Sequence, residues 1–350
     1  MKKQILDLLE GDQEKKLDSA KVILDNMPLF FNSVIQEAKT VHLEHFSPRI
    51  LLYAISYISD VCISSCQYCG HSKDNARKRR RLSLEEIEKD FSAVLQYHPQ
   101  ELCVLAGEDP KIFDHFIEAI KILNKLNPHF DNCLQLISLN IAPLDKPKFE
   151  KIIQDSQSKI PLQFRIFQET YDREEYTRNH TDGPKTNFDF RYSAQERALS
   201  SGFQSVGIGA LLGINSKGTK GNNQEILSLI AHAYDLKTKT GQFPESVAIP
   251  RLQPIPEQPS PKNFVEDKRY IFYLGVLRLA LPTVKIYITA REVASFIETV
   301  EPFINVRDLA PRPCVGGNIN GMDITKFQNL LGDSRSAKEI INDLKNRNKI

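Results

Sequence analysis

The stretch Cys62-Ile63-Ser64-Ser65-Cys66-Gln67-Tyr68-Cys69 places three cysteines within eight residues. It directly follows an apolar run, residues 50–58, that has the pattern of a strand. Three thiols in one short loop cannot all pair as disulfides, because one of them is left over. Thiolates are the usual ligands of iron–sulfur clusters, and a [4Fe–4S] cluster takes four ligands. The loop therefore predicts a cluster held by three cysteines, with one iron open to another molecule.

Zinc is the main alternative for this loop, because four-ligand zinc sites also use closely spaced cysteines. His71 lies two residues beyond Cys69 and is a candidate fourth ligand. The sequence has no second pair of cysteines or histidines with zinc-site spacing downstream. It therefore favours the iron–sulfur cluster over zinc.

Short β-rich segments alternate with longer amphipathic segments from residue 50 onward. Such alternation predicts parallel strands joined by right-handed helical crossovers. Eight strands in a chain of 350 residues fit one closed barrel better than two domains. The expected strands are Leu51–Ile58, Glu101–Ala106, Cys133–Leu139, Leu162–Phe167, Ser205–Leu211, Ser246–Arg251, Lys285–Thr289 and Asn305–Ala310. We predict an α/β protein with a (β/α)8 TIM-type barrel.

The remaining periodic segments predict helices. Residues 1–46 have helical periodicity, with Pro28 separating two helices, and we expect an N-terminal helical cap on a barrel that spans 47–350. Within the barrel, helices are expected over Ser83–Tyr97, Pro110–Leu126 and Gln224–Lys239. The first of these begins with the capping-box pattern Ser83-Leu84-Glu85-Glu86.

The composition is that of a globular protein, with 41% hydrophobic and 26% charged residues. A net charge of +2 gives no reason to expect a nucleic-acid partner, and the basic run Lys78–Arg81 is interpreted as a solvated loop face. No apolar stretch approaches the roughly 18 residues that cross a bilayer, and no signal-peptide core follows Met1. The isolated Cys103, Cys133 and Cys314 are expected to be small buried hydrophobes, which suits a cytoplasmic location.

Polar and glycine-containing segments follow several of the expected strands. Active sites of TIM-type barrels lie where the strands end at their carboxyl edge, so these segments are expected to meet at one mouth. They are the cysteine loop, Gly107-Glu108-Asp109, Gln168-Glu169-Thr170-Tyr171, Pro250-Arg251-Leu252, Thr289-Ala290-Arg291-Glu292 and Pro311-Arg312-Pro313-Cys314-Val315-Gly316-Gly317.

The spacing Cys62-x3-Cys66-x2-Cys69, with Tyr68 before the last cysteine, resembles the cluster loop of the radical S-adenosylmethionine (SAM) superfamily. Further motifs resemble its tyrosine lyase branch, which contains 2-iminoacetate synthase (ThiH), the hydrogenase-maturation lyase HydG and the tryptophan lyase NosL. Biotin synthase is a more distant relative that shares the barrel. The motifs are Tyr68-Cys69-Gly70-His71-Ser72, Ala106-Gly107-Glu108, Phe167-Gln168-Glu169-Thr170-Tyr171, Gly183-Pro184-Lys185, Phe188-Asp189-Phe190-Arg191, Gly207–Gly213, Pro250-Arg251-Leu252 and Thr289-Ala290-Arg291-Glu292.

The resemblance implies a cofactor site around the cysteine loop. Cys62, Cys66 and Cys69 would hold a [4Fe–4S] cluster whose open iron binds SAM, and the backbone around Tyr68 would meet the adenine. Gly107-Glu108 matches the strand end that receives the methionine amino group of SAM. A glycine there would let the ligand approach the backbone closely.

The resemblance also assigns roles to side chains on later strands. Glu169 would hydrogen-bond the ribose hydroxyls, as a pair of acceptors suits a diol, and Arg191 would grip the methionine carboxylate of SAM. Arg291 would bind the carboxylate of an amino-acid substrate. The alternative for each of these side chains is a purely structural role. Glu169 would then be the partner of a helix N-terminus, and Arg191 and Arg291 would be surface residues at the rim of the barrel. Glu292 is expected to favour a helix start, and Arg251 to line the pocket.

The function implied by the resemblance is that of a radical SAM lyase. Such an enzyme reductively cleaves SAM and then cleaves the Cα–Cβ bond of an aromatic amino acid, here tyrosine, giving dehydroglycine (2-iminoacetate) and p-cresol for thiazole and thiamine biosynthesis. The implied partners are the small amino-acid substrate, an electron donor such as flavodoxin or ferredoxin, and a thiazole synthase.

The sequence departs from the branch in two places. No cysteine follows Cys314, so the cyanide and carbon monoxide chemistry of a lyase with a second cluster is not expected. The segment 311–318 also differs from the Pro-Gly-Gly-rich pattern of the thiazole enzyme. Two alternatives stay open, namely a radical SAM synthase of the biotin synthase or methylornithine synthase type, and a non-catalytic metal-binding scaffold.

Overall fold

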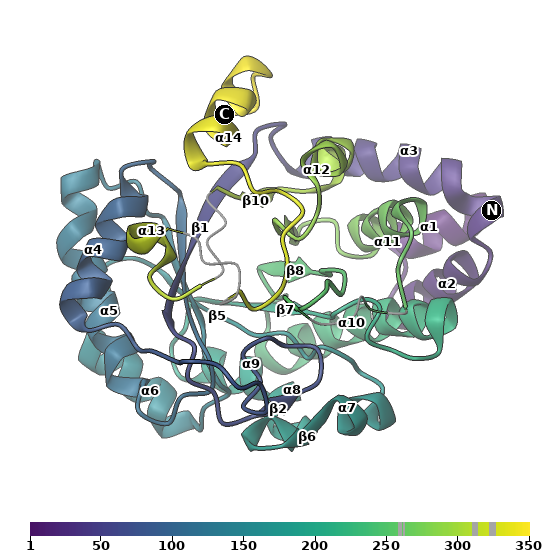
Figure 1. The fold of residues 1–350 in the computed structure, drawn as a ribbon. Coiled ribbons are helices and arrows are strands. Elements are labelled where there is room, and N and C mark those ends of the chain that lie inside the picture. Colours follow the sequence, from purple (N-terminus) through teal and green to yellow (C-terminus); the bar gives the residue numbers. More distant parts are fainter. Residues whose placement is uncertain (258–260, 262, 310–313, 322–326) are drawn as a thin grey trace.

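Eight parallel strands close into a barrel in this computed structural model, which describes residues 1–257, 261, 263–309, 314–321 and 327–350 (Figure 1). Around the barrel the strands follow the order β1-β10-β9-β8-β7-β5-β4-β3. Their bounds are β1 Leu51–Ser59, β3 Glu101–Ala106, β4 Leu136–Asn140, β5 Leu162–Arg165, β7 Ser205–Gly209, β8 Ser246–Ala248, β9 Lys285–Ile288 and β10 Val306–Asp308. All eight expected strands are present, so the predicted TIM-type barrel is confirmed. The expected end of the last strand, residue 310, lies outside the described residues.

Side chains along each strand point alternately into the barrel and toward its outer layer. Tyr53, Ile55 and Tyr57 of β1 line an interior pocket, while the intervening Ala54 and the later Ile58 are buried in the main hydrophobic core. A strand sends successive side chains to opposite faces, so a strand buried on both sides reads as one continuous apolar run. This explains why β1 was recognisable in the sequence without an alternating pattern.

Helices form the outer layer of the barrel, with α4 to α6 on one side and α10 and α11 on the other (Figure 1). The capping box predicted at Ser83 is formed with Glu86. The helix bounds are α4 Leu84–Leu95, α5 Phe113–Leu126, α6 Lys146–Ser156, α7 Arg173–Asn179, α8 Phe188–Tyr192, α9 Ala194–Ser200, α10 Gly218–Thr240, α11 Asp267–Ala280, α12 Ala294–Val300, α13 Gly317–Asn320 and α14 Ala337–Asn346. Short 3-10 helices span Asn127–Phe130, Pro184–Thr186 and Glu301–Phe303. None of the described helices is long and apolar enough to cross a membrane.

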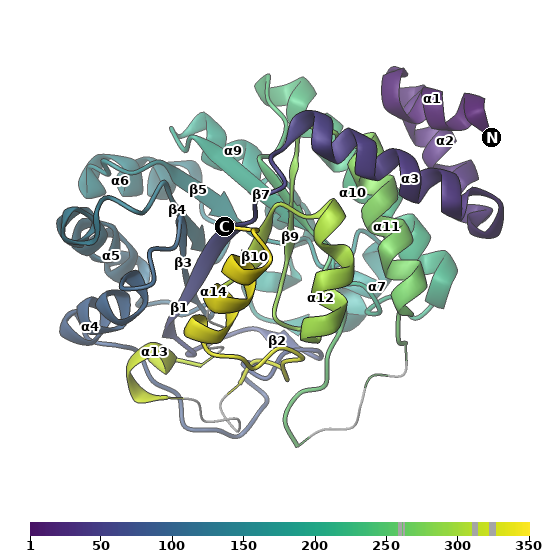
Figure 2. The same cartoon turned by 90° about the horizontal axis from the view of Figure 1, so that it is seen from above.

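The N-terminal segment forms three helices, α1 (Lys2–Glu10), α2 (Gln13–Asp25) and α3 (Met27–His45). Pro28 lies in the first turn of α3, where its missing N–H has no helical partner to lose. The three helices lie outside the barrel beside α10 and α11 (Figures 1 and 2). A Cβ atom on Gly275 of α11 would lie 2.9 Å from Val34 Cγ1, so this glycine permits the close approach of α3. The helices thus cover one flank of the barrel, and a separate N-terminal domain stays a prediction.

A second, two-stranded sheet lies outside the barrel and was not expected. Strand β2 (Ser65–Cys66) of the cysteine loop pairs antiparallel with β6 (His180–Asp182). Strand β6 directly follows α7 in the long connection between β5 and β7. This pairing joins the cysteine loop to a segment far away in the sequence and decides which side chains surround it.

Candidate functional site

One pocket lies at the carboxyl ends of the barrel strands and extends into the barrel. Parallel strands end on the same edge, so the segments that follow them are brought to one place. Nine residues predicted for the site line this pocket: Cys62, Cys66, Cys69, Tyr68, Gly107, Glu108, Glu169, Arg191 and Arg291. The barrel topology therefore unites groups that are spread over more than half of the chain.

Two arginines, Arg77 and Arg79, hold the cysteine loop in place through hydrogen bonds to backbone carbonyls. Arg79 Nη1 lies 2.8 Å from the carbonyl oxygens of both Asp60 and His71, and Arg77 Nη1 lies 3.0 Å from that of Gly70. Arg81 Nε donates to a carboxylate oxygen of Asp109 at 2.6 Å. The interpretation of Lys78–Arg81 as a solvated face was thus wrong for Arg79 and Arg81, which are half-buried. Arg79 satisfies backbone carbonyls, and Arg81 pairs with the buried carboxylate of Asp109.

A C-terminal segment covers the cysteine loop from the other side. The amide of Gln328 donates to the sulfur of Cys69 at 3.4 Å, and its oxygen accepts from the hydroxyl of Tyr57 at 3.1 Å. The backbone N–H of Gly70 donates to the carbonyl of Gln328 at 2.9 Å. Hydrogen bonds to a cluster's sulfur ligands influence its reduction potential. Gln328 was not predicted, because no motif marks it in the sequence.

The three thiols suit an iron–sulfur cluster better than a single metal ion. Among the described residues, no group of three or more His, Cys, Asp or Glu side chains is placed to hold one ion, so zinc gains no support. In a cluster each iron carries its own thiolate, and the ligands line a larger space. Burial raises the pKa of Cys66 to about 12 and the pKa of Cys62 above its ordinary value, while nearby Lys185 lowers that of Cys66. Metal coordination would supply the charge that makes these thiols thiolates.

Glu169, Lys185 and Arg191 form a buried charged group beside the loop. Lys185 Nζ lies 2.8 Å from Glu169 Oε1, and Arg191 Nη2 lies 3.6 Å from the same oxygen. Burial alone would raise the pKa of Glu169, but Lys185 and Arg191 hold it below its ordinary value. Glu169 is therefore a carboxylate at neutral pH. Arg191 also donates to the carbonyl of Phe167 at 2.7 Å, which fixes its position.

Lys185 belongs to the motif Gly183-Pro184-Lys185, but no role was predicted for it. Gly183, two residues earlier, has φ +89°, and a Cβ there would lie 2.5 Å from the carbonyl oxygen of Ile63 and 2.7 Å from Ser64 Cα. Only glycine fits this approach of the β6 segment to the cysteine loop. The backbone N–H of Lys185 then reaches the hydroxyl of Ser64 at 3.3 Å. In the sequence, Gly183, two residues before Lys185, was the feature that could have indicated this close approach to the cysteine loop.

The ring of Tyr68 is held by a neutral histidine. Its hydroxyl lies 2.7 Å from His180 Nε2, and His180 Nδ1 lies 2.8 Å from the carbonyl oxygen of Tyr176. Burial, and next Lys185, lower the pKa of His180 to about 3, so the imidazole is neutral. Nδ1 therefore donates to the carbonyl, and Nε2 accepts from Tyr68. This arrangement fixes the residue that precedes Cys69.

Gly107 and Glu108 contact the cysteine loop itself. A Cβ on Gly107 would lie 2.4 Å from the carbonyl oxygen of Val61 and 3.1 Å from Cys62 Cβ. The space on the Cβ side of this glycine is therefore occupied by the loop, and the approach of a ligand to its backbone stays a prediction. Glu108 accepts a hydrogen bond from Ser64 Oγ, and one of its oxygens lies 3.7 Å from Arg191 Nη1.

Charged residues close the inner end of the pocket. Arg165 lies 2.8 Å from Glu101 Oε1, and its guanidinium carbon lies 4.0 Å from the ring centroid of Tyr287. The hydroxyl of Tyr287 donates to Glu101, and Ser138 does so at 2.5 Å. Cys103, also in this lining, is buried as predicted, as is Cys314, whereas Cys133 is half-buried. Arg165 could have been noticed as a charge inside an apolar strand.

The segment after β9 contributes Arg291 and Thr289. Arg291 lines the pocket, and the hydroxyl oxygen of Thr289 is buried there without a hydrogen-bond partner. Buried polar atoms are normally satisfied, so this orphaned hydroxyl fits a pocket that receives a polar ligand.

Two expectations for this region were wrong. Arg251 is not among the residues that line the pocket; its guanidinium pairs with Glu292 at 3.0 Å and with Asp267 at 2.7 Å. Glu292 is buried in that pair and precedes α12, so it is a partner of Arg251 and not a helix-start charge. The segment 311–313, predicted at the mouth, lies outside the described residues.

The fold and the site define a class of barrel enzyme with a three-cysteine loop at the mouth, and comparisons with known proteins agree. The family model for the radical SAM superfamily matches residues 56–220. The structure of the [FeFe]-hydrogenase maturase HydG from Carboxydothermus hydrogenoformans is similar at 30% sequence identity and a TM-score of 0.80, covering 95% of this chain and 74% of that one. The 2-iminoacetate synthase of Escherichia coli (strain K12) is 24% identical over 304 residues, 83% of this chain and 76% of that protein.

The chain belongs to the radical SAM superfamily, in the branch of 2-iminoacetate synthase and HydG. The structure of methylornithine synthase, with a TM-score of 0.74 at 18% identity over 99% of this chain and 96% of that one, supports the barrel fold. Membership of the superfamily implies a [4Fe–4S] cluster and SAM as cofactors, a small-molecule substrate and a reductant.

Proposed function

We propose that this protein cleaves the Cα–Cβ bond of tyrosine, giving dehydroglycine and p-cresol. One observation carries the proposal: Arg291 lies in the same pocket as the cysteine loop. A guanidinium inside such a pocket suits the carboxylate of an amino acid, since it can donate two parallel hydrogen bonds. The similarity to 2-iminoacetate synthase and HydG supports a substrate of this class.

The cofactors would be held on the side of the pocket formed by the cysteine loop. We assign the three cluster ligands to Cys62, Cys66 and Cys69. Glu169 is a carboxylate that can accept from both hydroxyls of a ribose. Arg191 suits the carboxylate of SAM.

Lys185 adds a third charge to this group. Its ammonium lies 2.8 Å from Glu169 Oε1 and 5.4 Å from the ring centroid of Tyr68 in the cysteine loop, and it lowers the pKa of Cys66. We propose that it offsets the negative charge that three thiolates bring to the loop.

When bound, the cluster and SAM would supply a 5′-deoxyadenosyl radical, a species able to take a hydrogen atom from the amino group of an amino-acid substrate. The atoms of tyrosine are then divided between dehydroglycine and p-cresol without loss or gain. The two electrons and one proton that the reaction consumes convert SAM to methionine and 5′-deoxyadenosine. An external reductant must supply these electrons, for which we propose a flavodoxin or a ferredoxin.

The pocket walls suit an aromatic side chain. Tyr53, Tyr57, Phe167 and Tyr287 line the pocket, and the Arg165–Glu101 pair closes its inner end. Aromatic rings prefer edge-to-face and offset contacts with one another, which such walls provide. Exclusion of water protects a reactive intermediate from side reactions. We propose that Arg291 fixes the amino-acid end of the substrate while these rings receive its side chain.

The product dehydroglycine would serve thiazole formation, so a thiazole synthase is the proposed partner, in a cytoplasmic setting. Imines such as dehydroglycine hydrolyse in water, so a partner that takes the product directly would protect it. The proposal predicts that the yield of intact dehydroglycine rises when a thiazole synthase is present, whereas p-cresol is formed without it.

The test is an anaerobic assay with the reconstituted cluster, dithionite, SAM and tyrosine, in which 5′-deoxyadenosine and p-cresol are quantified. We expect p-cresol in the wild-type reaction and a much higher KM for tyrosine in Arg291→Ala. The matched control is Arg335→Ala, an arginine whose partners Asp333 and Asp343 lie outside the pocket lining. Formation of 5′-deoxyadenosine without p-cresol would refute tyrosine as the substrate and direct attention to the synthase alternative.

A further inference from the structure

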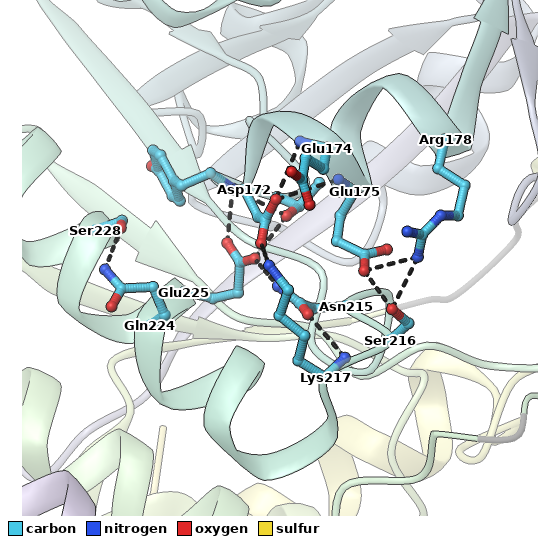
Figure 3. Close-up of polar contacts among 12 residues, drawn as sticks. Asp172, Glu174, Glu175, Arg178, Asn215, Ser216, Lys217, Gln224, Glu225 and Ser228 are labelled. Atoms are coloured by element: carbon cyan, nitrogen blue, oxygen red, sulfur yellow. Dashed lines mark hydrogen bonds and ion pairs between the residues drawn. The ribbon is translucent and has the colours of Figure 1, made fainter.

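Glu225 is a buried carboxylate of α10 that lies outside the pocket lining and contacts the segment that follows Glu169. One of its oxygens accepts from the hydroxyl of Thr170 at 2.5 Å and from the side-chain amide of Asn215 at 3.0 Å. Its other oxygen accepts from the backbone N–H of Tyr171 at 2.7 Å. Figure 3 shows the side chain of Glu225 pointing from its helix toward the segment that carries Asp172. The carboxylate therefore joins α10 to the loops that follow two barrel strands.

Glu169 itself has an unusual backbone. Its φ is +73°, in the left-handed region that residues with a side chain seldom adopt. Its carbonyl accepts from the backbone N–H of Leu211 at 2.7 Å, which fixes the residue on one side. Glu225 fixes the next two residues on the other side. A strained conformation persists only where its surroundings determine it, and here those surroundings are these two sets of bonds.

The conformation of Glu169 matters because its side chain points into the pocket. The carboxylate meets Lys185 at 2.8 Å and Arg191 at 3.6 Å, both of which line the same pocket. If the bonds to Thr170 and Tyr171 were lost, the backbone of Glu169 could relax out of the left-handed region and turn this carboxylate away. The cysteine loop would be unaffected, because none of the hydrogen bonds described for Glu225 involves it.

We propose that Glu225 is a positioning residue for SAM: by fixing the backbone after Glu169, it holds that carboxylate where the ribose of SAM binds. The inference rests on the proposed role of Glu169. It predicts that damage at Glu225 weakens the binding of SAM, while the cluster and the amino-acid subsite keep their properties.

The test uses Glu225→Gln in the anaerobically reconstituted holoenzyme. Glutamine has the same shape, but its NH2 group can accept no hydrogen bond and must face either the N–H of Tyr171 or the donors on the other oxygen. A buried donor without an acceptor is costly, so we expect the Kd for SAM to rise about tenfold. The KM for SAM should rise in parallel, while kcat at saturating SAM, the KM for tyrosine and the iron content stay near their wild-type values, and Tm falls by no more than it does in Glu175→Gln.

Glu175→Gln is the matched control, because Glu175 is equally buried and belongs to the same polar group in Figure 3. Its carboxylate contacts Arg178 at 2.8 Å and Ser216, and not Thr170 or Tyr171. Its Kd for SAM should stay at the wild-type value. An equal loss in both variants would overturn the inference, since any disturbance of this polar group would then have the same effect.

Thr170→Val keeps the test decisive if Glu225→Gln does not fold. It removes the hydroxyl that donates to Glu225 without changing the shape of the side chain, and it should weaken SAM binding by a smaller factor. If both variants fold, their effects should be less than additive, because they damage the same contact. Wild-type affinity in Thr170→Val and in any folded Glu225→Gln would refute the inference alone. A wild-type protein that does not bind SAM would overturn the proposed function as well.

Discussion

Replacing Lys185 by methionine removes the ammonium group that faces Glu169 and keeps a side chain of similar length. The two side chains are 12% and 13% exposed, and their charged atoms lie 2.8 Å apart. Removing one member of a buried ion pair leaves the other charge uncompensated and typically costs about 3–5 kcal/mol. Arg191 remains 3.6 Å from the same oxygen and compensates part of the charge. We therefore expect the lower end of the range, about 3 kcal/mol.

This destabilisation should depend on pH. In the wild type, Lys185 and Arg191 outweigh burial and lower the pKa of Glu169, so the pair contributes its full stability above the unfolded-state pKa. That contribution is lost as the pH falls through the lower folded-state pKa. Without Lys185, the pKa of Glu169 loses its largest lowering influence and should rise above its wild-type value. The variant should therefore be most destabilised near neutral pH, with the difference from the wild type shrinking as the solution is acidified.

The assay is anaerobic thermal unfolding of wild-type, Lys185→Met and Lys185→Arg holoenzyme at neutral and at mildly acidic pH. The methionine variant should lose several degrees of Tm at neutral pH and less in acid, and the arginine variant should lose little. Lys73→Met is the control, because Lys73 pairs with Asp182 of β6 on an exposed surface. A wild-type Tm in Lys185→Met, or a loss that does not change with pH, would refute this electrostatic reasoning.

Three further changes give direct tests of the site. Cys66→Ser should abolish most iron binding and the visible absorbance of the cluster, whereas Cys133→Ser should leave both unchanged; equal iron contents would contradict the ligand assignment. Gly183→Ala should destabilise the protein by about 1–3 kcal/mol from its backbone conformation alone, since φ +89° with ψ −177° is a combination that residues with a Cβ avoid. The loss should be larger because the new Cβ meets the carbonyl of Ile63, and the cluster should be lost faster in air; an unchanged Tm would contradict the close approach. Arg291→Lys should keep the Kd for SAM but raise the KM for tyrosine, since a point charge replaces a two-pronged donor, and a selective change in SAM binding would show that Arg291 serves the cofactor.

The barrel and most of its pocket could be predicted because their signals are local. Each strand buried on both faces is a short apolar run, as in Leu51–Ser59, and the cysteine loop is contiguous. Once the strands are assigned, the topology places Glu169 and Arg291, which follow β5 and β9, beside the loop, whereas Arg191 lies on α8 and was predicted from the family resemblance. Prediction at this level needed no knowledge of side-chain contacts.

The contacts that shape the site could not be predicted, because they join segments distant in the sequence. The pairing of Ser65–Cys66 with His180–Asp182 involves strands too short to leave a pattern, and Lys185 reaches the loop only through this pairing. The Arg251–Glu292 pair likewise joins the ends of two strands, so each residue alone suggested a different role. Arg79 shows the same limit, since a run of basic residues does not reveal which backbone carbonyls face it.

The most direct test of the central claim is to measure which amino acid stimulates reductive cleavage of SAM. Reconstituted, reduced protein would be incubated anaerobically with SAM and each of the twenty common amino acids, and 5′-deoxyadenosine would be quantified. The account predicts that tyrosine stimulates its formation most strongly and that p-cresol appears in equal amount. Stimulation by an aliphatic amino acid instead, or no stimulation by any, would contradict it.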